Sequence, residues 1–358
     1  VAAINALITA DSEILDPNSM AERARVKGAL NEISQTATKL LKPGHTHVLW
    51  FEPTYSTLYL APLAVSDVLR GNLLTQTPVI ATSATLTVGK SFDAIAKNIG
   101  FVIGGKNEAE DEVEEDEDNL KKKGSMDPAN LQILDVGSPF DFANQGMLYL
   151  PKDLPEPGRD GPSKEALVEL GELIEAAGGR TLALFSSWRG VEAADEHLRE
   201  VLAELKLPII TQRRGDSVGP LVEKFAKDEK SILLGTISLW QGIDVPGPAC
   251  TLVAIDRIPF PRPDEPVLSA RAAEADAAGG SGFMQISLPR AALLLAQGTG
   301  RLIRSLDDRG VVAILDSRIV NKRYGSILLN SMPPFWRTSD GAVIKDALRR
   351  LDAQYLKK

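Results

Sequence analysis

The chain has 358 residues, enough for about two domains, and its 44% hydrophobic and 25% charged residues are typical of a globular protein. The net charge of −8 is local, because residues 108–118, EAEDEVEEDED, hold nine acids and the rest of the chain carries +1. The lack of an apolar run of about 18 residues excludes a membrane span. A single cysteine, Cys250, excludes an internal disulfide and an iron–sulfur cluster within this chain, and it fits a reducing, cytoplasmic location.

The first residues, VAAINALITADSE, have no basic region and do not predict a signal peptide. The initial Val1 suggests a fragment of a longer chain or a processed start. Apolar residues at helical spacing predict a helical segment over residues 1–45, which Pro43 and Gly44 bring to an end. His45 and His47 alternate on the next predicted strand, but no third ligand is near, so we expect no metal site.

Residues 46–104 contain two predicted strands, 47–53 and 77–86, followed by a helix that starts at Ser91. Residues 105–130 include the acidic run and are predicted to be a solvated, disordered insertion. An alternative is that this run mimics a nucleic acid and occupies a basic groove.

Residues 131–345 alternate regularly between apolar strands and amphipathic helices. Because the strands are continuous apolar runs, the pattern predicts an α/β fold whose parallel sheet is covered on both faces. Residues 346–358 are predicted to be a C-terminal helix or tail. The predicted strands of this part are 131–136, 147–151, 181–187, 208–212, 231–235, 251–256 and 311–316.

Ligands of such sheets bind beyond the carboxyl ends of the strands, so the residues that follow each strand are candidate site residues. They are rich in hydroxyl groups and arginines, which suit phosphate oxygens. They are Ser186, Ser187, Trp188 and Arg189, Gln212, Arg213 and Arg214, Gly235 and Thr236, Asp256 and Arg257, and Asp316, Ser317 and Arg318.

The stretch QGTGRLIRSLDDRG, residues 297–310, has a different pattern. The spacing of Gln297, Arg301 and Arg304 predicts one stripe of a helix, with Leu302 and Ile303 on the opposite face. Gly298 and Gly300 each cost about 1 kcal/mol relative to Ala in a helix interior, which makes sense if a ligand must approach the backbone there. Two arginines on one face favour an anion between them, although an ordinary surface helix is an alternative.

Four motifs occur in an order that resembles superfamily 2 helicases of the DinG/XPD type. ATSATL (81–86) resembles motif III, LFSSWRG (184–190) motif IV, LGTISLWQGIDVPG (234–247) motif V and QGTGRLIR (297–304) motif VI. SPFDFANQG (138–146) is similar to the start of the second motor lobe in this family. The resemblance covers roughly residues 46–335 and corresponds to the C-terminal portion of such a helicase.

The resemblance implies a RecA-like second motor lobe, a helical segment and part of the first lobe. ATP with Mg²⁺ would bind between the lobes, and single-stranded DNA, extending to duplex junctions, would cross both. The implied function is unwinding of duplexes during 5′–3′ translocation, in repair or replication. By this resemblance, Arg301 and Arg304, beside Gln297, would stabilise charge on the γ-phosphate. ATP binding falls to Gly242, Asp244 and Gly300, and coupling of the two lobes to Thr82, Ser83 and Thr85. The residues that would bind DNA are Ser186, Ser187, Arg189, Arg213, Arg214 and Thr236.

Two stretches look like the catalytic motifs that a helicase also needs. ATLTVGKS (84–91) matches a relaxed P-loop with Lys90, but its β-branched residues resist the backbone conformations that wrap a phosphate. Asp195, Glu196 and His197 resemble an acidic box, yet they lie within an amphipathic helix rather than at a strand end. We therefore expect the P-loop, the Mg²⁺ ligands and the rest of the N-terminal motor portion upstream of Val1. The alternatives are a non-catalytic nucleic-acid-binding module and a self-sufficient nucleotidase that uses Lys90.

Overall fold

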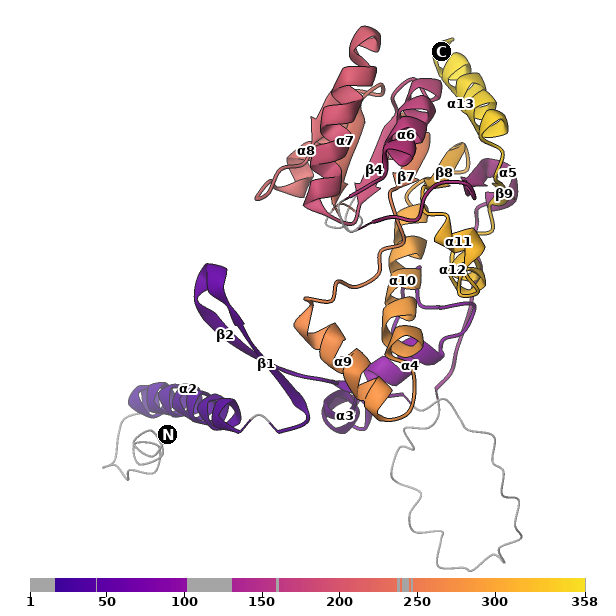
Figure 1. Cartoon of the computed structure of the whole chain (residues 1–358). Helices are drawn as coiled ribbons and strands as arrows, with labels where there is room; N and C mark the ends of the chain where they lie inside the picture. The colour runs from indigo at the N-terminus through magenta and orange to yellow at the C-terminus, as the bar shows by residue number, and fades with distance from the viewer. Residues whose placement is uncertain are drawn as a thin grey trace, which may run out of the picture.

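The computed structural model describes residues 17–42, 44–101, 131–158, 161–236, 239, 245 and 247–357 (Figure 1). The acidic run at residues 108–118, Gly242 and Asp244 lie outside the described residues, so the predictions made for them are untested.

A seven-stranded sheet forms the centre of the larger part of the chain, and every neighbouring pair of its strands is parallel. The predicted α/β fold is therefore confirmed. In spatial order the strands are β5 (Ile209–Thr211), β6 (Ile232–Thr236), β4 (Thr181–Phe185), β7 (Leu252–Ile255), β8 (Gly310–Ile314), β3 (Gly146–Tyr149) and β9 (Trp336–Thr338).

Helices cover both faces of this sheet. Successive side chains of a strand point to opposite faces, and here both sets are apolar, so each face needs a covering layer. Leu182 and Leu184 of β4 belong to the hydrophobic cluster on one face, and Ala183 and Phe185 to the cluster on the other. The first cluster includes side chains of α8 (Val218–Lys227), α10 (Leu288–Thr299) and α12 (Gly325–Ser331), and the second those of α6 (Lys164–Ala176), α7 (Trp188–Val201) and α13 (Gly341–Tyr355). Shorter connections contain α5 (Phe142–Gln145), α9 (Pro266–Ala277), a π-helical turn (Phe283–Ser287) and α11 (Arg318–Asn321).

The C-terminal helix α13 is an integral part of this layer. Lys345 forms an ion pair with Glu169 of α6 at 3.1 Å, and Ile344 and Leu348 are fully buried. The boundary predicted at residue 345 therefore falls inside a helix that packs on the sheet.

The N-terminal part is built from smaller elements. Helix α2 (Pro17–Leu41) agrees with the predicted helical segment, and β1 (His47–Glu52) pairs with β2 (Thr57–Pro62) in an antiparallel hairpin that projects away from the main sheet in Figure 1. The elements α3 (Ser66–Leu69), a π-helical turn (Arg70–Leu74) and α4 (Asp93–Ile99) follow. Arg271 of α9 donates a hydrogen bond to Asn98 of α4 at 2.6 Å, so these two helices lie side by side.

Two predicted strands, 77–86 and 131–136, are wrong. Neither segment is a strand, and both expose apolar side chains, with Ile80 92% and Val136 86% exposed. A strand needs a neighbour to satisfy its backbone N–H and C=O groups, and a strand-like sequence does not supply one. Both segments instead line an apolar groove of about 1170 Å³. The assignment of residues 46–104 to a first motor lobe stays a prediction.

The turn between α6 and β4 depends on two adjacent glycines with positive φ. A β-carbon on Gly179 (φ +86°) would clash with the backbone carbonyl oxygen of Lys230, whereas one on Gly178 (φ +63°) would meet only the flexible side chain of Asp352. We expect Gly179→Ala to lower the free energy of unfolding by more than about 3 kcal/mol and Gly178→Ala by about 1–2 kcal/mol. Urea denaturation of the two variants would measure this difference, and equal losses would contradict the assigned clash.

Candidate functional site

The candidate residues lie at opposite edges of the seven-stranded sheet. Ser186, Arg213 and Thr236 stand at the carboxyl ends of β4, β5 and β6, as predicted from the strand pattern. The loop of residues 300–309, which carries Arg301 and Arg304, leads instead into the amino end of β8. The sheet therefore has two candidate surfaces, which we call the carboxyl edge and the amino edge.

At the amino edge, the predicted helical stripe is wrong. Helix α10 ends at Thr299 with Gly300 as its C-cap, so Gln297 lies in the last turn while Arg301 and Arg304 lie beyond the helix. Gly300 is thus not in a helix interior and has an ordinary φ of −67°. Leu302 and Ile303 are each 2% exposed, so the apolar side chains of this stretch are buried as predicted although the chain is no longer helical.

The arginine loop, residues 300–309, is held by two buried side chains. The Asp308 carboxylate accepts the backbone N–H of Arg304 at 2.7 Å and that of Ser305 at 2.8 Å, in place of helix carbonyl oxygens. The Gln145 amide nitrogen donates to the carbonyl oxygens of Ser305, Leu306 and Asp308 at 3.1–3.2 Å. Side chains therefore bind both backbone N–H groups and backbone carbonyl oxygens of this loop.

Three polar side chains of the amino edge could meet an anionic ligand. Arg301 and Arg304 are half-buried, and the side-chain oxygen Oε1 of Gln297 is buried without a hydrogen-bond partner. Gln297 lies in the last turn of α10, just before the loop of Arg301 and Arg304. Its unpartnered oxygen can accept a hydrogen bond from a ligand, and the two guanidinium groups can bind negative charge, a combination that suits a hydrated phosphate. Cys250 lies near this loop, but burial raises the pKa of its thiol to about 12, so it is not a reactive thiol.

At the carboxyl edge, buried carboxylates organise the turns after β4, β7 and β8. Asp256 accepts the Ser186 N–H at 3.0 Å and its hydroxyl at 3.3 Å, and it pairs with Arg257 at 3.0 Å. Burial raises the pKa of Asp256 to about 6, although Arg257 opposes the shift. Asp316, fully buried, holds Arg318 at 2.7 Å in the same way.

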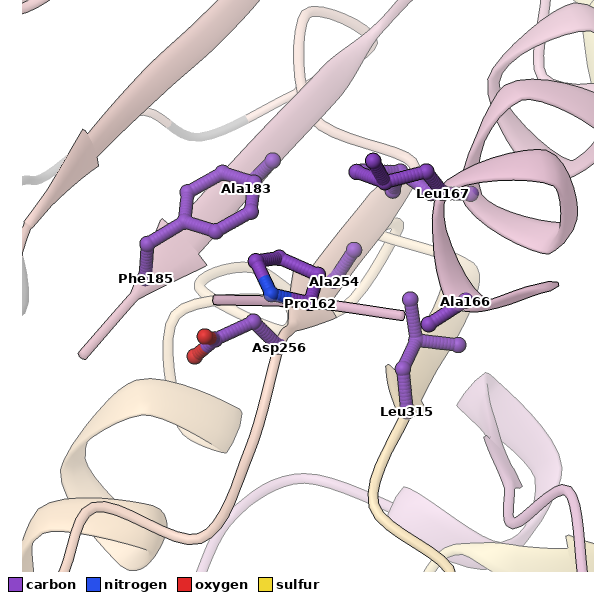
Figure 2. Close-up of a pocket in the computed structure, with 9 residues that line it drawn as sticks. Pro162, Ala166, Leu167, Ala183, Phe185, Ala254, Asp256 and Leu315 are labelled. Atoms are coloured by element: carbon purple, nitrogen blue, oxygen red, sulfur yellow. The ribbon is translucent and has the colours of Figure 1, made fainter. Parts of the chain in front are cut away.

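The small cavity beside Asp256 is not a ligand site. Figure 2 shows Asp256 next to Pro162, with hydrocarbon side chains such as Ala166 and Leu315 forming the other walls. Its volume of about 10 Å³ admits at most about one water molecule. Asp256 therefore serves the turn of Ser186 rather than a substrate pocket.

The turn after β4 begins helix α7. Ser187 is the N-cap of this helix, and its hydroxyl oxygen accepts the N–H of Gly190 at 3.1 Å. Arg189 on the first turn is exposed, and the guanidinium of Arg214 lies 5.8 Å from the centre of the Trp188 ring. An aromatic ring, two arginines and a helix N-terminus thus share this part of the carboxyl edge.

Arg213 and Thr236 are also fixed at this edge. The Arg213 guanidinium pairs with the buried Asp195 at 3.1 Å, yet its side chain remains 60% exposed. The N–H and hydroxyl of Thr236 donate to the side-chain oxygen of Gln212 at 2.9 and 3.2 Å. Asp195 lies in α7 and anchors arginines, including Arg199 at 2.9 Å, as expected of a helix position rather than an acidic box.

The P-loop-like stretch forms a different structure. Val88 and Ser91 exchange two backbone hydrogen bonds of 2.9 and 3.0 Å around Gly89 and Lys90, which both have positive φ. This is a tight two-residue turn, and its Gly89 N–H is bound to the Ser331 hydroxyl at 2.7 Å. Upstream, Thr82, Ser83 and Thr85 lie in irregular chain, where the Ser83 hydroxyl accepts the Thr85 N–H at 3.2 Å.

Sequence reasoning missed Asp308 and Gln145, although both lie inside stretches that it singled out. Neither belongs to an apolar periodicity, and polar residues next to glycines are also common in exposed turns. Only the close packing of the loops at the amino edge shows that both side chains are buried.

Comparisons with known proteins agree with this geometry. The family described as helicase C-terminal domain matches residues 170–335. The ATP-dependent helicase DinG of Mycobacterium tuberculosis strain H37Rv is 47% identical over 90% of this chain and 46% of its own length. The ATP-dependent DNA helicase YoaA of Escherichia coli K12 is 35% identical over 89% of the chain and 44% of its own length. A relative from Bacillus subtilis, 29% identical over 77% of the chain and 28% of its own length, is named 3′-5′ exonuclease DinG.

The fold also matches a solved structure. An XPD helicase aligns with a TM-score of 0.50 and 16% identity, over 92% of this chain and 57% of that chain. The parallel sheet thus has a RecA-like fold. The chain carries a helicase C-terminal domain, and over most of its length it is similar to helicases of the DinG/XPD type. It spans about half the length of the curated relatives that it matches.

Among the described residues, no helix is long and apolar enough to cross a membrane.

Proposed function

We propose that the chain is the C-terminal motor portion of an ATP-dependent DNA helicase, which unwinds duplexes while it translocates 5′–3′ on single-stranded DNA, in repair or replication. The observation that carries the proposal is the separation of two surfaces on one RecA-like sheet. The amino edge carries two half-buried arginines in one loop, which suit an anion, and the carboxyl edge carries hydroxyl groups and arginines, which suit a phosphate backbone. The names of the relatives support ATP and DNA as the two ligands.

ATP would bind at the amino edge against a nucleotide-binding portion of the full-length protein. Arg301 and Arg304 would stabilise the negative charge that develops on the γ-phosphate, and the buried Gln297 oxygen would accept a hydrogen bond from water or the nucleotide. Bound Mg²⁺ would neutralise phosphate charge, and we place its ligands in the N-terminal portion, together with a P-loop.

Single-stranded DNA, up to its junction with the duplex, would follow the carboxyl edge. The exposed guanidinium groups of Arg189, Arg213 and Arg214 would neutralise phosphates, and the Ser186 and Ser187 turn and Thr236 would border the backbone. Thr82, Ser83 and Thr85 would couple the two lobes, and Gly242 and Asp244 would border the nucleotide.

A second candidate is a non-catalytic nucleic-acid-binding module. The turn at Gly89 and Lys90 favours it for this stretch of chain, because its backbone cannot cradle a phosphate while the Gly89 N–H is bound to Ser331. The two functions differ in whether the full-length protein hydrolyses ATP in response to DNA.

We expect the full-length protein to hydrolyse ATP faster when single-stranded DNA is present. The double variant Arg189→Ala, Arg213→Ala should bind DNA at least about tenfold more weakly. Its affinity should also depend less on salt, because each lost phosphate contact lowers the slope of log affinity against log salt concentration by about one. The double variant Arg349→Ala, Arg350→Ala, which removes the same charge from two exposed positions on α13, is the control. DNA affinity that is indifferent to salt, or equal in the double variant and the control, would contradict the carboxyl edge as the DNA surface.

A further inference from the structure

Asp308 joins two loops that approach the amino edge from different parts of the sequence. Its Oδ2 atom accepts the backbone N–H groups of Arg304 and Ser305, and its Oδ1 atom accepts the Ser305 hydroxyl at 2.8 Å and the Gly247 N–H at 3.1 Å. Gly247 lies in the connection into β7, whereas Arg304 precedes β8. With only 5% of the residue exposed, one carboxylate thus fixes both loops relative to each other.

Gln145 holds the same arginine loop from the other side. It is the last residue before β3, and its Oε1 atom accepts the Asp141 N–H at 2.8 Å, which fixes the orientation of the amide. Its nitrogen is therefore directed at the three carbonyl oxygens of Ser305, Leu306 and Asp308. Donors of the loop are bound by Asp308 and acceptors by Gln145, so the loop cannot shift without breaking bonds that are shielded from water.

We propose that Asp308 and Gln145 are positioning residues for ATP hydrolysis, which hold Arg301 and Arg304 where the transferring phosphoryl group develops charge. This proposal rests on the proposed helicase function. A guanidinium stabilises a transition state only when it lies within about 0.5 Å of its productive position. A displacement of about 1 Å from that position can lower the rate about a hundredfold. The Arg304 backbone N–H is bound directly by Asp308, so a change in this carboxylate moves the arginine itself.

Asp308→Asn is a sharp test because it keeps the size of the side chain. In one orientation the new NH₂ group faces the N–H groups of Arg304 and Ser305, and in the other it faces the N–H of Gly247. Either way at least one backbone donor loses its acceptor and meets another donor. Gln145→Glu is the complementary change, since it sets a carboxylate oxygen against three carbonyl oxygens.

The chain supplies a matched control for each variant. Asp307→Asn removes the same charge from an exposed neighbour of Asp308, and Gln354→Glu makes the same substitution as Gln145→Glu at an exposed position of α13. In the full-length protein we expect Asp308→Asn and Gln145→Glu to lower kcat for DNA-stimulated ATP hydrolysis by about tenfold or more, with KM for ATP and DNA affinity within about twofold of wild type. Both controls should keep wild-type turnover.

Hydrogen exchange gives a readout that does not depend on activity. Asp308→Asn should accelerate exchange of the backbone N–H groups of Arg304, Ser305 and Gly247, while amides of β4 and β8 keep their protection. Turnover equal to wild type in Asp308→Asn, or exchange that rises throughout the sheet, would overturn the positioning role. Gln145→Glu decides the question independently if Asp308→Asn does not fold. A wild-type protein without ATP turnover would overturn the proposed function, and this proposal with it.

Discussion

In the full-length protein, we expect Arg301→Ala and Arg304→Ala each to lower kcat for ATP hydrolysis, at least one of them by more than about a hundredfold, with little change in ATP affinity. Arginine fingers contribute roughly 10³–10⁵ in rate, because they act on charge that is present mainly in the transition state. Both arginines lie outside helix α10 in the loop that Asp308 and Gln145 hold, so they are placed by a fixed backbone. Steady-state kinetics with saturating single-stranded DNA would measure the effect.

Lysine at either position should not restore the rate, because a compact ammonium cannot reproduce the planar fork of a guanidinium. Arg290→Ala is the matched control, since it removes the same charge from an exposed position near the start of α10. Surface arginines contribute less than about 1 kcal/mol. Normal DNA-stimulated turnover in both alanine variants would therefore show that Arg301 and Arg304 are ordinary surface residues.

The second large effect concerns the 358-residue chain by itself, which we expect to have no ATPase activity. The best P-loop candidate is a tight turn around Gly89 and Lys90, and its one glycine N–H is already bound to Ser331. The loop therefore has no nest of backbone N–H groups to bind a β-phosphate. Phosphate release by the purified chain, with and without single-stranded DNA, would measure this.

Lys90→Ala supplies the decisive comparison for that experiment. If the chain did hydrolyse ATP and the variant did not, the self-sufficient nucleotidase would be the correct interpretation. Hydrolysis that persisted in the variant would point to a different phosphate site in the same chain.

The sequence correctly predicted strands that have neighbouring strands in the described structure. It wrongly predicted strands in two segments that have no such neighbour there. The strands β4, β6, β7 and β8 are apolar runs buried on both faces, and each was predicted within a few residues. Residues 77–86 and 131–136 have the same apolar character, but they are not strands and have no hydrogen-bonded partner strand within the part of the chain that the structure describes. Local composition specifies a preference for extended chain, whereas a sheet also requires partners that composition does not identify.

The candidate site was predicted in part for a similar reason. The strand pattern correctly placed Ser186, Arg213 and Thr236 at one edge, because parallel strands end together. Helical spacing misplaced Arg301 and Arg304, because the helix ends at Thr299 and the Asp308 carboxylate, instead of helix carbonyl oxygens, accepts the backbone N–H groups of Arg304 and Ser305. Such competition between a buried polar group and a local pattern is decided by tertiary packing.

The distance between the two edges of the sheet also determines how large a movement the lobe can transmit from one edge to the other. Strands β4, β6 and β8 are five residues long, so the edges lie roughly 16 Å apart at about 3.3 Å per residue. The side chains between them, such as Leu182, Leu184 and Leu233, are fully buried hydrocarbon that offers no chain of polar groups. The lobe can therefore act as a stiff lever arm, in which a rotation of about 10° at one edge carries the other through roughly 3 Å. In the proposed helicase, a step along DNA and the arrival of an arginine at a phosphate would then be a single movement.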